Sequence, residues 1–150
     1  MPRTSRWTSL LLAGAISLAS TLSASSAELK SPDMVKMGLR ILAGVYGDMD
    51  RKLAADQYDR LPHENQEFQE GSGALRDAVA HEPREFKGHV KLALDKTLAD
   101  ANQVAEASKS HDKAQVQAAL HSLAESLTAL NALFPEALRA EPGTVAPGHP

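Results

Sequence analysis

The chain has 150 residues, no Cys, six His and a formal net charge of -3. Without a thiol there can be no disulfide, no Cys-ligated zinc, no thiol nucleophile and no covalently attached c-type haem. The negative charge and an aromatic content of 4% also exclude the basic face and the stacking platform by which most nucleic-acid-binding proteins act.

The first 27 residues have the features of a secretory signal peptide. Arg3 and Arg6 precede an uncharged stretch, and small residues follow up to Ala27. We expect cleavage after Ala27, with Ala24 as a second cut site. The apolar stretch is short and interrupted by Ser and Thr, so no stable membrane insertion is expected after cleavage. The mature protein would be periplasmic or secreted, with its folded domain over residues 28–140.

The next segment predicts a first helix that begins at Ser31-Pro32-Asp33 and reaches about Leu53. Ser31 is a candidate cap, and Pro is tolerated in a first helical turn. Apolar residues recur at helical spacing and predict the inner face: Met34, Met37, Ile41, Val45 and Met49. Three glycines interrupt this helix and weaken it. Close approach to a partner helix or to a bound planar group would explain why they are there.

Three further helices are predicted, over 63–80, from 83 to 108, and from the cap Asp112 to Phe134. The second buries Phe68, Leu75 and Val79. The inner face of the third is Phe86, Val90, Ala93, Thr97, Ala101 and Val104. The fourth has the clearest period in the chain: Val116, Leu120, Leu123, Leu127, Leu130 and Phe134.

Four amphipathic segments with mostly short connections predict an all-α fold, an antiparallel up-down-up-down four-helix bundle. Residues 141–150 contain three Pro and two Gly and offer little to bury. We expect them to form a disordered tail.

The polar residues do not predict an enzyme. His63 with Glu67, and Glu85 with His89, are spaced as solvated pairs on a helix surface, and His121 lies outside the apolar stripe of its helix. The sequence contains no Glu-x-x-His, His-Glu-x-x-His or Gly-x-Ser-x-Gly motif and no phosphate-binding Gly-rich loop. No convergent set of catalytic groups is therefore expected.

Three segments resemble the soluble cytochrome b562 family: Glu-Leu-Lys-Ser-Pro-Asp-Met at 28–34, Arg-Glu-Phe-Lys-Gly-His at 84–89 and Lys-Ala-Gln-Val-Gln-Ala-Ala at 113–119. The run from Gly38 to Met49 is similar to the first helix of cytochromes c′. The resemblance implies a four-helix bundle of this superfamily. In the b562 family, a Met near the start of the first helix and a His near the end of the fourth hold the haem.

Carried over residue by residue, the resemblance places Met34 at the axial Met position and Asn131 where the axial His is expected. The two haem-attaching Cys of cytochromes c′ would fall on Leu127 and Leu130. The favoured hypothesis is therefore a haem-free relative that acts as a binding or interaction protein, with no cofactor.

The alternative is an electron carrier that binds haem b non-covalently through Met34 and an unidentified second ligand. Copper bound as Cu(I) by the thioethers of Met34, Met37 and Met49 is a third hypothesis. The partner would be an unidentified protein or small ligand, and the cytochromes c′ also suggest a homodimer.

Overall fold

The computed structural model describes residues 28–142. The predicted signal peptide and most of the predicted tail lie outside these residues. Within them all regular secondary structure is helical, which confirms the predicted all-α class. The helices are α1 Pro32–Ala54, α2 Leu61–Ala78, α3 Arg84–Ser108 and α4 Lys113–Asn131, with two short 3-10 helices, η1 Tyr58–Arg60 and η2 Glu136–Leu138. This part of the chain contains no strand.

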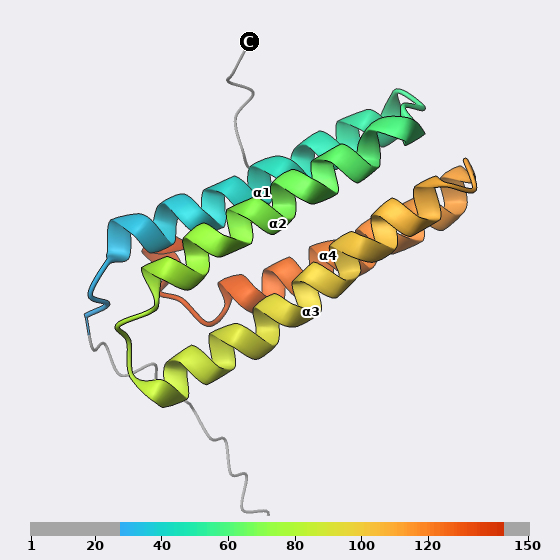
Figure 1. The fold of residues 1–150 in the computed structure, drawn as a ribbon. Coiled ribbons are helices and arrows are strands. Elements are labelled where there is room, and N and C mark those ends of the chain that lie inside the picture. The colour runs from blue at the N-terminus through green and yellow to red at the C-terminus, as the bar shows by residue number, and fades with distance from the viewer. Residues whose placement is uncertain (1–27, 143–150) are drawn as a thin grey trace, which may run out of the picture.

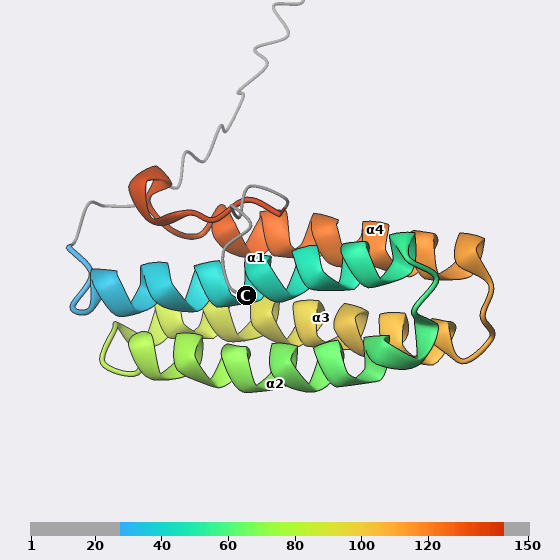
Figure 2. The same ribbon diagram turned by 90° about the horizontal axis from the view of Figure 1, so that it is seen from above.

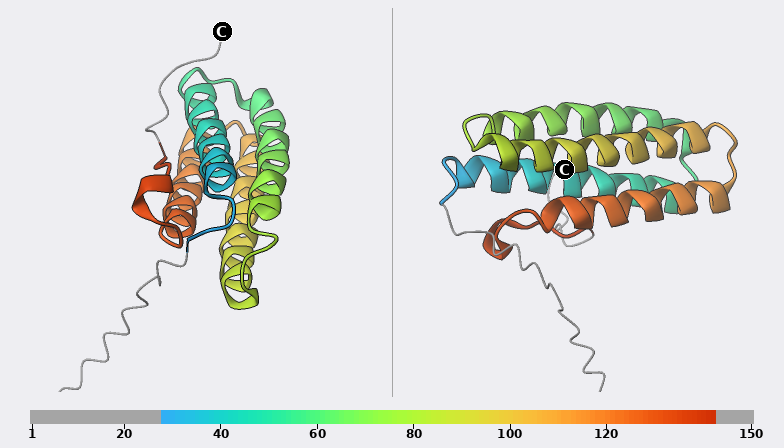
Figure 3. Two further views of the ribbon diagram at one scale, coloured as in Figure 1. Left: turned by 90° about the vertical axis from the view of Figure 1, so that its left-hand side faces the viewer. Right: turned by 90° about the horizontal axis from the view of Figure 1, so that it is seen from below.

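The helices lie side by side and form two pairs (Figure 1). α1 packs most extensively on α2, and α3 on α4. The α1–α2 and α3–α4 connections lie at one end, and the α2–α3 connection lies at the other (Figure 2). After α4 the chain turns back along the outside of the bundle, where η2 contacts α1 (Figure 3). No helix of the described chain is long and apolar enough to cross a membrane.

Local sequence explains the start of α4, whereas the capping of α1, the start of α2 and the end of α4 differ from prediction. Asp112 caps α4 as predicted, because its Oδ1 accepts hydrogen bonds from the backbone N–H groups of Ala114 and Gln115 at 3.0 and 3.3 Å. Ser31 does not cap α1 with its side chain. Its carbonyl instead accepts the first helical bond, from the Val35 N–H at 3.0 Å. α2 begins two residues earlier than expected, directly after η1, and α4 ends at Asn131 rather than at Phe134.

The core is formed largely by the predicted faces of α2, α3 and α4. Every residue of the predicted α4 stripe is buried, as are Phe68, Leu75 and Val79. α3 adds two leucines that its predicted face lacked, Leu94 and Leu98. The Phe86 ring packs edge-on against Phe134, with ring centroids 5.7 Å apart.

The predicted inner face of α1 was wrong over its first half. Met34, Met37 and Ile41 are 44%, 52% and 37% exposed. The residues of α1 that belong to the core form a neighbouring stripe instead: Val35, Leu39, Leu42, Val45, Met49 and Leu53. Both stripes are apolar at helical spacing, so periodicity alone could not say which of them faces the core. Only Val45 and Met49 of the predicted set are buried.

Two glycines allow α1 and α2 to approach each other closely. A Cβ on Gly38 would lie 3.1 Å from the Cα of Leu75 in α2, and one on Gly71 would lie 2.6 Å from Cγ2 of Ile41. Gly44 has open space where its side chain would be. Close approach to a partner helix therefore accounts for Gly38 but not for Gly44.

We predict opposite effects for two glycine substitutions in α1. Gly38→Leu should lower the free energy of unfolding by about 1–3 kcal/mol, because a side chain there presses on the α2 backbone. Gly44→Ala should raise it by about 1 kcal/mol, because Ala favours helix and meets no neighbour. Urea unfolding measures both. Equal effects of the same sign would contradict close helix approach at Gly38.

Candidate functional site

Met34, the predicted axial ligand, lies on the outer surface of α1. Its side chain is almost half exposed, whereas the adjacent Val35 is fully buried. Met37 is also exposed, while Met49 is fully buried. The three thioethers therefore do not share one face, and the inner Met stripe on which the copper hypothesis rested does not exist.

Asn131, at the expected axial His position, is buried, with 1% of its surface exposed. Its Nδ2 donates to the Leu127 carbonyl at 2.9 Å, and its Oδ1 accepts from the Ala140 N–H at 2.8 Å. The second bond spans nine residues and holds the segment after α4 against the bundle. Arg139 secures the same segment, because its Nε donates to the Phe134 carbonyl at 2.9 Å.

The surroundings of Asn131 consist of packed apolar side chains. Leu127, Leu130 and Phe134 are each at most 1% exposed and belong to the single apolar core. Neither Asn131 nor these residues offers a strong axial donor for haem iron. The residues at this place thus do not fit a haem held between α1 and α4.

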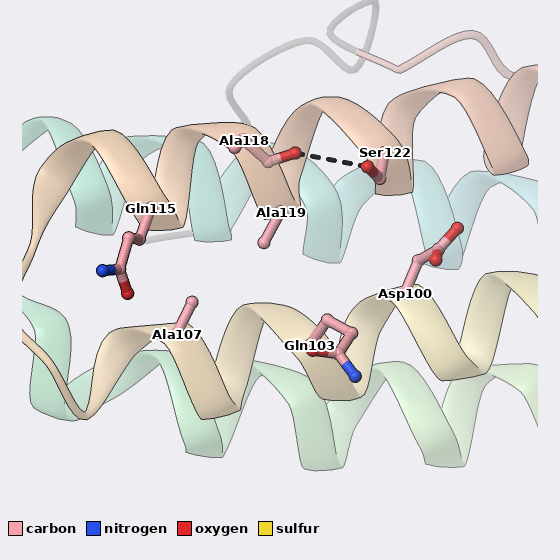
Figure 4. A pocket seen from close by; sticks show the side chains of 7 residues that line it. All are labelled: Asp100, Gln103, Ala107, Gln115, Ala118, Ala119 and Ser122. Atoms are coloured by element: carbon pink, nitrogen blue, oxygen red, sulfur yellow. Dashed lines mark hydrogen bonds between the residues drawn. The ribbon is translucent and has the colours of Figure 1, made fainter.

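A groove open to solvent, with a volume of about 480 Å³, lies between α3 and α4 (Figure 4). Its lining residues are Asp100, Gln103, Ala107, Gln115, Ala118, Ala119 and Ser122. Asp100 is bound by Lys96, whose Nζ lies 2.7 and 2.5 Å from the two carboxylate oxygens. The Ser122 hydroxyl donates to the Ala118 carbonyl at 3.3 Å. The groove therefore presents polar groups of Asp100, Gln103, Gln115 and Ser122 to solvent.

Sequence reasoning missed this groove. It exists because Ala107, Ala118 and Ala119 are small where α3 and α4 run side by side (Figure 4). The signal that could have indicated the groove is the presence of alanines at facing positions of the last two predicted helices.

Two histidines, His63 and His121, lie on the surface in separate pairs with glutamates. His63 Nε2 lies 3.2 Å from Glu67 Oε1, and His121 Nε2 lies 3.4 Å from Glu125 Oε1, with all four side chains exposed. This confirms the predicted surface position of His121 and the solvated His63–Glu67 pair. Within residues 28–142, no three His, Asp or Glu side chains gather as a metal site would require.

The connections α1–α2 and α3–α4 are joined by polar and ring contacts. Tyr58 stacks on His111 with ring centroids 5.1 Å apart, and His111 Nε2 lies 3.2 Å from Asp59 Oδ1. Lys113 Nζ donates to Asp56 Oδ1 at 3.0 Å, and this bond lowers the pKa of the Asp56 carboxyl. Sequence reasoning missed these contacts, which join residues more than 50 positions apart.

Glu64 is a nearly buried carboxyl on the α1-facing side of α2, 6% exposed. Burial raises its pKa, and the charges of Glu67 and Asp48 raise it further, against smaller opposing effects of Lys52 and His63. Its ionised form is therefore less favourable in the folded protein than in the unfolded chain.

Comparison with family models, with curated proteins and with solved structures gives no match. The function is therefore inferred from the residues described above.

We predict that Asn131→Ala destabilises the protein by about 1–3 kcal/mol, because the buried Ala140 N–H loses its acceptor. Urea unfolding measures the loss, and limited proteolysis should show faster cleavage around residues 135–142. Asn102→Ala is the matched control, since Asn102 is exposed and makes only surface hydrogen bonds. A similar loss in both variants would show that Asn131 does not secure this segment.

We predict that Glu64→Gln raises the melting temperature at neutral pH. The raised pKa means that the stabilising contribution of Glu64 is present below its unfolded pKa and is lost as pH rises through its folded pKa. The advantage of the variant should therefore shrink as pH falls towards the ordinary carboxyl value of 4.5. Glu70→Gln, at an exposed position of the same helix, should give no such benefit. An advantage independent of pH would contradict the role of burial.

Proposed function

We propose that the protein is an exported, haem-free relative of the cytochrome b562 and c′ bundles that acts as a binding or interaction protein. In this proposal its four helices form an antiparallel up-down-up-down bundle, and export follows cleavage after Ala27. The observation that carries the haem-free assignment is Asn131, whose two amide atoms are both engaged with backbone groups inside the core.

The position of Met34 supports the same proposal. A haem shared by α1 and α4 needs an α1 donor that points between these helices, and Met34 is instead exposed to solvent. Leu127, Leu130 and Phe134 fill the core around Asn131 with side chains that do not ligate iron. The electron-carrier alternative, with Met34 and a second ligand, therefore lacks support at both axial-ligand positions, the one on α1 and the one on α4.

A haem titration tests the proposal. Adding haem to the purified protein should give no saturable change in the Soret band and no rise in melting temperature, because a ligand that binds only the folded state must stabilise it. A cytochrome b562 treated in the same way is the positive control. Stoichiometric haem in the protein as purified would refute the haem-free assignment.

Asn131→His provides a sharper form of this test. It restores the ligand that the family resemblance predicts at this position, but Met34 remains on the surface. We expect the variant to gain no tight haem binding. Tight binding by this variant would show that the α1–α4 region can open to form a haem site.

A further inference from the structure

Three exposed apolar side chains form one stripe on the surface of α1. Within residues 28–142, four large apolar residues are exposed: Met34, Met37, Ile41 and Leu92. The first three recur at spacings of three and four along α1, whereas Leu92 stands alone on α3. Grouped apolar side chains on a surface are typical of an interface, and Met adapts well to differently shaped partners.

This stripe borders an acidic stripe of α2. Ile41 reaches Gly71 of α2, and Glu67 and Ala74 lie one turn before and after Gly71. Glu67, Glu70, Ala74 and Asp77 follow one another at spacings of three and four residues. The opposite flank of α2 faces α3, where Asn65 and Gln69 hydrogen-bond to Asn102. The acidic stripe therefore points away from α3 and lies beside the apolar stripe of α1.

In residues 28–142, His63 is the only basic side chain that forms an ion pair with this stripe. Glu67 pairs with His63, and Glu70 accepts a hydrogen bond from the Gln66 amide at 3.1 Å. In the described chain, no Lys or Arg forms an ion pair with Glu67, Glu70 or Asp77. We call the combined surface the Met–acid face: Met34, Met37, Ile41, Glu67, Glu70 and Asp77.

We propose that the Met–acid face binds a basic amphipathic helix of another protein. The apolar side chains of that helix would cover Met34, Met37 and Ile41, and its Lys or Arg side chains would meet the α2 carboxylates. This inference rests on the proposed function as an interaction protein, and it names the surface and the chemical class of the partner.

The charge of the face argues against two other occupants. A second copy docked through the same face would bring three carboxylates against three, and like charges across an interface are costly. An anionic membrane surface would be repelled for the same reason. The α3–α4 groove has no comparable stripe, because its apolar lining consists only of alanines.

The experiment uses a synthetic helical peptide with Leu at positions i, i+3, i+4 and i+7 and Lys on its other face. Fluorescence anisotropy should show binding to the purified protein that weakens as salt rises. Amide chemical shifts should change over residues 34–44 and 67–77. The same peptide with Glu in place of Lys should not bind.

Matched substitutions locate the binding. Met37→Lys and Glu70→Lys should each weaken peptide binding at least about tenfold, because each adds a positive charge to the face. Leu92→Lys is the control, since Leu92 is 70% exposed on α3. It should leave the affinity unchanged. Circular dichroism must show all three variants to be as helical as the unchanged protein.

Several results would overturn the proposal: no binding, equal binding of the acidic peptide, shift changes confined to α3 and α4, or an equal loss in Leu92→Lys. Self-association that Met37→Lys abolishes would identify a second copy as the occupant instead. Binding to anionic vesicles through the same residues would identify a membrane. If the protein binds neither haem nor the peptide, only the proposal of the Met–acid face is refuted. If it contains stoichiometric haem, the proposed function is refuted.

Discussion

Burial of apolar helix faces is the constraint on which this bundle depends, because a chain without Cys has no covalent cross-link to add. Leu39, Leu42, Phe68, Leu94 and Leu123 come from all four helices and are at most 1% exposed. In a closely packed core, both a cavity and an oversized side chain destabilise the folded state. The close contact of α1 with α2 at Gly38 follows from the same demand, since a side chain at this position would force the two helices apart.

The same constraint determines what a buried polar side chain can do. A polar group in the core must find hydrogen-bond partners, and Asn131 finds them in the Leu127 carbonyl and the Ala140 N–H. One side chain thereby fixes the C-terminal segment on the bundle.

Packing also explains why an apolar stripe remains outside. α1 carries two apolar stripes, and only one of them can face the other three helices. Val35, Leu39 and Leu42 take the core side, and this leaves Met34, Met37 and Ile41 beside the acidic stripe of α2. An exposed apolar stripe beside carboxylates that form no ion pair with Lys or Arg in residues 28–142 favours binding of a basic, amphipathic partner over self-association.

The sequence by itself determined the helices and the inner faces of α2 and α4, because their apolar residues follow a single stripe and because Asp112 marks the start of α4. It also drew attention to Asn131, at the position where the resemblance to the b562 family predicts an axial His. Tertiary structure alone decided which stripe of α1 is buried, where α3 and α4 leave a groove, and that Asn131 bonds to Ala140. These features depend on contacts between residues that are distant in the chain, and the periodicity of a single helix carries no information about its neighbours.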